Sequence, residues 1–466
     1  MSPVLTSLLA WGVLSFGAVY PWGYGTLAAG VAICALWTAR QAALGRPGVV
    51  LSSLGLLILA CAAQIIALPR GTLEQLSPHI SQFLSGVDIA YASGAVNRHA
   101  LSIDPSQTIL ALGFIFFGFA WAWVCASVAR RTGGFTRALA RNIVALGLLV
   151  AVIGLAQKAT FNGKLLWFWE PMSYATNAFG PFVNRNHFAG WMILALMLSV
   201  GYLFGRFSSR AASRESTWRD HLLWIGSPEG TPIILTAVAI AVMACSLLWT
   251  MSRSGIAGAG AAVTILTAAA VYRSNRRTMR VALAGYLLLT VAGLVAWRGT
   301  DTLFAWYGNT GTLEWRFDLW KDTLPALEDF WMTGSGLNTY DTLMLGYPRT
   351  HMTQMPREAH NDYLQLAVEG GLLVCIPVLL LILSVGRTIV RRLKQPQDEM
   401  TWWIRMGAAA GICGIAVQEL TEFSLQIPGV ALLFATCVAL AVHEPVPVQS
   451  RRRNRTARET SPELAA

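Results

Sequence analysis

The sequence predicts an all-α protein that crosses a membrane many times. Of its 466 residues, 55% are hydrophobic and only 13% are charged, against about 25% charged in a typical soluble domain. Apolar runs of about 17 to 22 residues, long enough to span a bilayer, recur along the chain. Basic residues gather between alternate runs. These observations favour a polytopic membrane protein over a soluble domain.

About twelve apolar runs qualify as transmembrane helices. The first two form a tight hairpin that turns at Pro21. A secretory signal peptide is the alternative for the first run, but no basic residue precedes it and no cleavage site follows, so we expect a retained helix. The predicted spans are Val4–Tyr20, Trp22–Thr38, Val49–Leu68, Thr108–Ala129, Leu139–Ala156, His187–Gly205, Ile233–Thr250, Ser254–Tyr272, Val281–Trp297, Leu366–Gly386, Trp403–Thr421 and Pro428–His443.

The basic residues predict the orientation of these spans. With Met1 on the inner side, 24 of the 35 Lys and Arg residues fall on one side, mostly in short segments. The positive-inside rule makes that side cytoplasmic, with both termini there. We therefore expect a multi-pass protein of the bacterial inner membrane. The net charge of +11 then reflects topology and contact with anionic membrane lipid, and does not indicate nucleic-acid binding.

Two long loops and one shorter loop are predicted on the outer, periplasmic face. The long ones cover about 69–107 and 298–365. Long connections are where function concentrates. We divide the chain into N-terminal helices (1–157), a transmembrane core (158–443) and a basic cytoplasmic tail (444–466) that we expect to be disordered.

The second long loop is predicted to contain short amphipathic helices. Apolar residues recur there at spacings of three and four, which indicates a helix lying against the membrane or the bundle. Pro325 should divide it into two short helices. The apolar positions are Leu313, Phe317, Trp320, Leu324, Leu327 and Trp331.

No metal or other cofactor is expected. All seven cysteines lie inside predicted spans, so the sequence offers no disulfide framework and no CxxC metal site. It also lacks an Asp-x-Asp pair, an HExxH motif, a Gly-x-Ser-x-Gly elbow and a phosphate-binding P-loop.

Arg185 and Arg253 are candidate anion-binding residues. Each stands at the outer mouth of a helix whose N-terminus faces outward, where free N–H groups and the helix dipole favour an anion. Arginine adds a planar fork that pairs with two phosphate oxygens, and a lipid diphosphate lies at this depth. Arg185 is surrounded by the polar side chains of Asn184, Asn186 and His187, and serines flank Arg253. The alternative is an arginine that snorkels to headgroups or closes a structural ion pair.

His360, at the mouth of the tenth span, is the candidate general base. A neutral imidazole accepts a proton from an attacking hydroxyl, and a nearby carboxylate holds the useful tautomer. Two alternatives stay open. Asn361 or Asp362 is simply the N-cap of the span, with His360 a surface neighbour, or Glu358, His360 and Asp362 bind a divalent ion. His187 is the reserve candidate for the base.

Other polar and aromatic residues of the outer face are supporting candidates. Arg316 is either a third phosphate or sugar contact or part of a structural ion pair. Glu419 and Glu422 close the eleventh span, where a carboxylate needs a partner, so one of them orients His360 or neutralises an arginine. The aromatic residues of this face form an interfacial belt, and a minority stack against sugar rings. They are Trp167, Trp169, Tyr174, Trp306, Trp315 and Tyr340.

Four motifs in this order resemble the O-antigen ligase and polymerase superfamily. The similarity covers about residues 179–433, with the long outer loop before the histidine. Glu422 is a departure, since Asp is expected before the Phe, but the charge is kept. The motifs are Gly180-Pro181-Phe182-Val183-Asn184-Arg185-Asn186-His187, Ser252-Arg253-Ser254-Gly255, His360-Asn361-Asp362-Tyr363 and Glu422-Phe423-Ser424-Leu425-Gln426-Ile427-Pro428.

The resemblance implies a metal-independent, inverting, GT-C-like glycosyltransferase that takes glycan from undecaprenyl diphosphate. Arg185 and Arg253 would hold the diphosphate, with Arg316 in a less settled role, and His360 would activate the acceptor hydroxyl. The resemblance does not separate ligases, whose acceptor is lipid A core or a protein, from polymerases, whose acceptor is the glycan of a second lipid-linked repeat. The alternatives are a twelve-span polysaccharide or lipid transporter, although related halves are not evident, and a non-catalytic scaffold.

Overall fold

Helices make up nearly all of the regular structure. The computed structural model describes residues 2–41, 49–171, 178–211, 227, 230–273, 311–347 and 356–444. In this part of the chain the named strands are two antiparallel two-residue segments, β1 (Leu68–Pro69) and β2 (Arg98–His99), with Leu68 opposite His99. The all-α prediction is confirmed.

Eight of the described helices are long and apolar enough to cross a membrane. Three shorter apolar helices accompany them. Together they overlap every predicted span except Val281–Trp297, which lies outside the described residues. The chain is thus a polytopic membrane protein, but a count of twelve spans is not confirmed. The long helices are α2 (Pro21–Gln41), α7 (Pro105–Arg131), α8 (Phe135–Ala159), α9 (Arg185–Ala211), α11 (Thr231–Trp249), α12 (Arg253–Arg273), α17 (Asp362–Lys394) and α18 (Glu399–Gln418), and the short apolar ones are α1 (Ser2–Leu14), α3 (Val49–Ala63) and α19 (Pro428–Val442).

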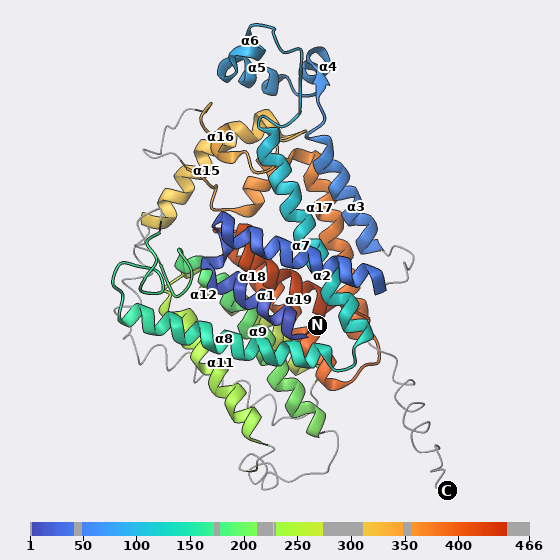
Figure 1. Ribbon diagram of the computed structural model, residues 1–466, viewed down its shortest axis with the longest axis vertical. Coiled ribbons are helices and arrows are strands. Elements are labelled where there is room, and N and C mark those ends of the chain that lie inside the picture. The colour runs from blue at the N-terminus through green and yellow to red at the C-terminus, as the bar shows by residue number, and fades with distance from the viewer. Residues whose placement is uncertain are drawn as a thin grey trace.

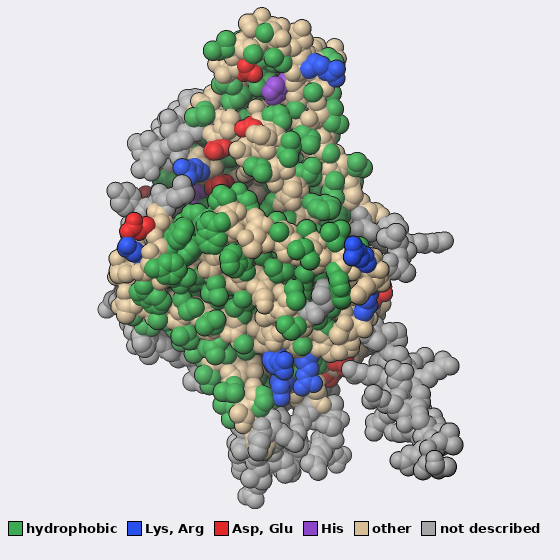
Figure 2. All heavy atoms as spheres, viewed as in Figure 1, with side chains coloured by type: hydrophobic (Ala, Val, Ile, Leu, Met, Phe, Trp, Pro, Cys, Tyr) green, Lys and Arg blue, Asp and Glu red, His purple; other side chains and the backbone are tan. Residues whose placement is uncertain are grey.

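The remaining helices are short or lie in the outer loops. Figure 1 shows α4, α5 and α6 at one end of the molecule, beyond α15 and α16, with the membrane helices below them. Hydrophobic side chains cover a broad area in the middle of the face seen in Figure 2, as a lipid-facing surface requires. These helices are η1 (Phe16–Ala18), α4 (Arg70–Leu76), α5 (Pro78–Val87), α6 (Ile89–Ala92), α15 (Gly311–Phe330), α16 (Tyr340–Leu343) and η2 (Ser424–Gln426).

Helices α9, α12 and α18 pack with their backbones in direct contact. A methyl group added at Gly407 of α18 would lie 2.5 Å from the Met197 carbonyl oxygen of α9, and one added at Gly258 of α12 would lie 2.5 Å from the Gly414 carbonyl oxygen. Small residues allow this approach, which is how membrane helices maximise their van der Waals contact. The outer ends of the three helices are therefore held in a fixed arrangement.

Helix α15 corrects the prediction of two short helices. It runs without interruption from Gly311 to Phe330 with Pro325 inside it. Its buried side chains are Leu319, Asp322, Thr323, Ala326 and Phe330. Packing of this face offsets the cost of about 3 kcal/mol for a proline inside a helix.

The predicted apolar stripe of α15 lies largely on its open side. Phe317 and Leu324 are 53% and 47% exposed, and so is Trp331, just after the helix, at 53%. These positions recur every seven residues, so they share one face. The stripe is therefore divided, because these three side chains are open whereas Leu327 packs against an apolar cluster shared with α4 and α5, and Trp320 donates to the Ala359 carbonyl.

Helix α17 is broken near its outer end. Gly371 has φ 54° and ψ −166°, a conformation that residues other than glycine rarely adopt. The N–H groups of Leu372 and Leu373, after the break, donate to the carbonyls of Trp331 and Met332. The predicted span Leu366–Gly386 thus contains a break that separates an outer segment, 362–370, from the longer apolar segment.

Candidate functional site

Helices α9 and α12 begin with a capping residue followed directly by a candidate arginine. The Asn184 side chain accepts from the Asn186 N–H at 2.9 Å, and Arg185 is the first residue of α9. The Ser252 hydroxyl accepts from the Gly255 N–H at 3.1 Å, and Arg253 is the first residue of α12. The caps fix the two helix starts and place both arginines beside the positive end of a helix dipole.

Helix α17 is capped by Asn361, one residue after His360. The Asn361 side chain accepts from the N–H groups of Tyr363 and Leu364, both at 3.1 Å. The alternative that Asn361 serves as the N-cap is thus correct. His360 is nevertheless more than a surface neighbour of the cap, because only 22% of its side chain is exposed and it faces a buried carboxylate.

That carboxylate is Glu422, in the connection between α18 and α19. Glu422 is fully buried, and its Oε1 accepts from Asn186 Nδ2 at 2.5 Å and from Arg316 Nη2. Its Oε2 lies 3.7 Å from His360 Nδ1, and neither of these atoms has a hydrogen-bond partner among the described residues. The structure therefore brings together candidates from α9, α15, the start of α17 and the α18–α19 connection.

The three candidate arginines lie near one another, and two of them interact with this carboxylate. Arg185 interacts electrostatically with Glu422, Arg253 and Arg316. Arg316 pairs with Glu422 and keeps 13% of its side chain exposed. A bound anion would relieve the repulsion of Arg185 by Arg253 and Arg316, so this arrangement favours an anionic ligand.

His360 is held by its backbone and by two rings. Its φ of 49° lies in the left-handed region, which costs a residue other than glycine of the order of 1–3 kcal/mol. The preceding carbonyl, of Ala359, accepts from Trp320 Nε1 of α15 at 2.9 Å. The His360 ring centre lies 5.1 Å from that of Trp315 and 4.9 Å from that of Phe423. Contacts with α15 thus compensate for the strain and fix the imidazole.

His187, the reserve candidate, lies in a different environment. It is only 6% exposed. Its ring centre lies 4.7 Å from that of Phe423, which contacts both histidine rings. The Oε2 atom of Glu422 faces His360. The geometry therefore favours His360 over His187 as the candidate base.

The other acidic residues near His360 have partners of their own. Asp362 accepts from Gln426 Nε2 at 2.8 Å, so it is not the carboxylate beside His360. Glu358 accepts from Gln365 Nε2 at 2.9 Å, and burial raises the pKa of Glu358 to about 7. Within the described residues no group of three or more His, Cys, Asp or Glu side chains is arranged to hold a metal ion, so the structure gives no support to the alternative of a divalent-ion site.

Several residues of the site were not singled out from the sequence. Gln418 donates to the Asn186 carbonyl at 2.7 Å and so ties α18 to the start of α9. Phe423 contacts the His360 ring, and adjacency to Glu422 in the chain is its sequence signal. Trp315 also contacts this ring, whereas the sequence placed it only among the aromatic residues of the interfacial belt.

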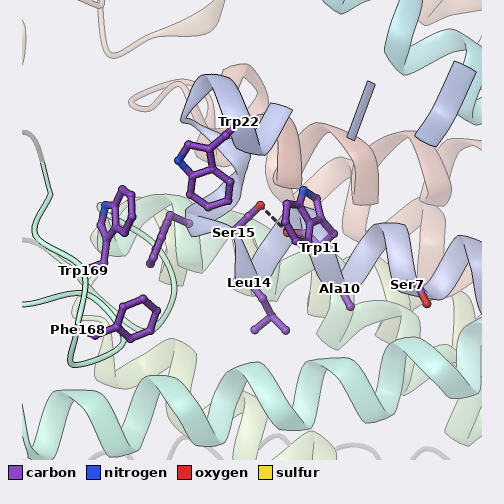
Figure 3. A pocket seen from close by; sticks show the side chains of 9 residues that line it. Ser7, Ala10, Trp11, Leu14, Ser15, Trp22, Phe168 and Trp169 are labelled. Carbon is purple, nitrogen blue, oxygen red and sulfur yellow. Dashed lines mark hydrogen bonds between the residues drawn. The ribbon is translucent and has the colours of Figure 1, made fainter. Parts of the chain in front are cut away.

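An apolar pocket of about 420 Å³ lies apart from these charged groups, at the turn between α1 and α2. Figure 3 shows its lining side chains, which come from α1, η1, α2 and the loop before α9 and include no charged group. The pocket therefore does not contain the candidate site. It is lined by Ser7, Ala10, Trp11, Leu14, Ser15, Phe16, Trp22, Phe168 and Trp169.

Comparison with known families supports one of the classes of protein considered. Residues 238–383 match the family model described as O-antigen ligase. The predicted resemblance to the O-antigen ligase and polymerase superfamily is confirmed. The matched segment contains Arg253, Arg316 and His360, whereas Arg185 and Glu422 lie outside it. The match indicates a glycosyltransferase of ligase or polymerase type in a multi-pass membrane protein. No curated protein matches the chain.

Proposed function

We propose that this protein transfers a glycan from undecaprenyl diphosphate to an acceptor hydroxyl at the periplasmic face of the bacterial inner membrane. The observation that carries the proposal is that Arg185, Arg316 and His360 all interact with buried Glu422, while Arg253 lies within electrostatic range of Arg185. The cluster offers an anion site and a base within one region.

Arg185 and Arg253 bind the diphosphate of the donor. As the bond from the sugar to the diphosphate breaks, negative charge develops on the leaving oxygen, and the arginines stabilise it. Arg316 is held by Glu422 and contributes its remaining N–H groups to the same anion or to a sugar. In this mechanism the arginines supply the charge stabilisation, and no metal ion is needed.

His360 activates the acceptor. Its Nδ1 faces Glu422, which leaves Nε2 to accept the proton of the acceptor hydroxyl. The acceptor oxygen forms a bond to the anomeric carbon, and the bond to the diphosphate oxygen breaks with its electron pair. The products are the glycosylated acceptor and undecaprenyl diphosphate, and single displacement inverts the anomeric configuration. Glu422 stabilises the imidazolium that forms, and Asn184 and Asn186 hold the start of α9.

The distribution of basic side chains supports an outward-facing site. Arg206, Arg273 and Arg391 lie near the C-terminal ends of α9, α12 and α17, whose other ends carry the candidate site. By the positive-inside rule those C-terminal ends are cytoplasmic. The termini are then also cytoplasmic.

The test is transfer by purified protein in detergent with EDTA, given undecaprenyl-diphosphate oligosaccharide and glycan, lipid A core or protein acceptors. His360→Ala should lower transfer by about 10²–10⁴-fold, and Arg185→Ala and Arg253→Ala should weaken use of the donor. Lys321→Ala, at an exposed site of α15, is the control.

Full activity of His360→Ala would remove the proposed base, and loss of wild-type activity in EDTA would exclude the metal-independent mechanism. The acceptor that is extended distinguishes ligase from polymerase.

A further inference from the structure

Two consecutive side chains of α15 reach the candidate base and its carboxylate. Arg316 donates to Glu422, and the Trp315 ring meets the His360 ring edge to face, with 77° between the ring planes and 5.1 Å between their centres. A third α15 residue, Trp320, holds the Ala359 carbonyl. Helix α15 therefore holds the loop that carries His360 in place and also contacts the His360 ring.

Trp315 is the partly exposed aromatic residue in contact with His360. It is 39% exposed, whereas Phe423, which also contacts the His360 ring, packs against the main apolar core. Burial of the indole is thus incomplete although it contacts the imidazole. A molecule that places a hydroxyl on His360 can therefore reach aromatic surface of Trp315.

We propose that Trp315 stacks against a pyranose ring of the acceptor, so that the hydroxyl activated by His360 belongs to a sugar. The C–H groups on one face of a pyranose form a flat apolar surface that fits an indole, while its hydroxyl groups project from the rim toward the imidazole. A serine or threonine hydroxyl of a protein offers no such surface. This inference rests on the proposed function and adds the class of acceptor.

The experiment compares Trp315→Leu and Trp315→Phe with wild type in the same transfer assay, using saccharide acceptors and peptides that contain serine and threonine. The matched control is Trp331→Leu, since Trp331 is also exposed, at 53%, and lies beyond the other end of α15. For wild type we expect transfer to saccharides and not to peptides. Trp315→Leu should raise the acceptor KM about tenfold, equal to about 1.4 kcal/mol, with kcat and the donor KM within about twofold of wild type, which indicates lost ground-state binding.

The remaining variants and outcomes complete the test. Trp315→Phe should keep most of the acceptor affinity, because a ring remains, and Trp331→Leu should match wild type. An unchanged acceptor KM in Trp315→Leu, or wild-type transfer to peptides in preference to saccharides, overturns the stacking role and leaves the proposed function intact. Absence of transfer by wild type to every acceptor overturns the proposed function as well. Equal thermal unfolding midpoints for the variants exclude misfolding as the cause of a raised KM.

Discussion

Glu422 connects three of the candidate residues at the scale of single side chains. It is fully buried and is bound by Asn186 and Arg316, with His360 3.7 Å from its second oxygen. A buried carboxylate is costly unless it is paired, and removing one partner of a buried pair leaves the other charge uncompensated. The residue therefore has a structural role and a role at the base.

Substitution of Glu422 should affect both roles. Glu422→Gln keeps the shape but removes the charge that balances Arg316, so we expect a destabilisation of about 3 kcal/mol, near the lower end for a broken buried pair because Arg316 is partly exposed. Transfer should fall by at least about tenfold. Thermal unfolding in detergent and the transfer assay measure the two effects. Glu422→Asp retains the charge and should lie between the other two proteins, and a Gln variant as stable and active as wild type would contradict both roles.

Glu358 should make stability depend on pH. Burial raises its pKa from 4.5 to about 7 in the folded protein, so between these values the folded state binds more protons than the unfolded state. Stability from this group is present below pH 4.5 and is lost as the pH rises toward 7. The unfolding midpoint of wild type should fall more between pH 5 and pH 8 than that of Glu358→Gln. Equal changes in the two proteins would refute the assignment.

At the scale of elements, the break in α17 decides where His360 lies. Gly371 approaches the backbone of Met332 and Gly334, and the N–H groups after the break bind the segment that follows α15. The outer part of α17 thus packs with α15, and the loop that carries His360 lies against the same helix. A continuous helix would not make these contacts.

Gly371→Ala should therefore be strongly destabilising. A methyl group there would clash with backbone atoms of Met332 and Gly334, which cannot move aside as a flexible side chain can. The positive φ adds strain. We expect a loss of stability of at least about 2 kcal/mol and reduced transfer, measured by thermal unfolding and by the transfer assay. Gly386→Ala is the matched control in the same helix, because nothing lies within 4 Å of an added methyl group. It should be neutral or slightly stabilising, and equal effects at both positions would contradict the account.

At the scale of the whole molecule, helices α4 and α5 pack against α15. A second apolar cluster joins Leu73, Ile80 and Leu84 of α4 and α5 to Ala326 and Phe330 of α15. His79 Nδ1 of α5 lies 3.3 Å from an oxygen of Asp329 in α15. Segments separated by more than two hundred residues in the chain thus cover the same end of the bundle, and their side of the membrane must be the same.

Labelling with a membrane-impermeant maleimide tests this arrangement and its orientation. Ser93→Cys, after α6, should react in intact spheroplasts, and Lys394→Cys, at the C-terminal end of α17, should react only after the membrane is disrupted. The unsubstituted protein measures labelling of the native cysteines. Reaction of Lys394→Cys alone in intact spheroplasts would reverse the proposed topology. Reaction of both positions there would exclude it.

The sequence by itself determined the class of fold and the identity of the charged candidates. Apolar runs long enough to span a bilayer indicate membrane helices, because lipid cannot form hydrogen bonds with exposed backbone groups. The helix caps at Asn184 and Asn361 are local features of the chain. The motifs that resemble the O-antigen ligase family contain Arg185, Arg253 and His360, so these candidates follow from the sequence without any knowledge of contacts. These signals depend on residues close together in sequence.

Only the tertiary structure decided which partners these residues have. Contacts between Glu422 and residues of α9, α15 and the α17 start join segments far apart in the chain, so no local pattern specifies them. The same holds for the uninterrupted α15, where burial of the opposite face outweighs the cost of Pro325, and for the break at Gly371, which depends on the segment packed against it. The edge-to-face contact of Trp315 with His360 belongs to this group, since adjacency to Arg316 says nothing about which ring the indole meets.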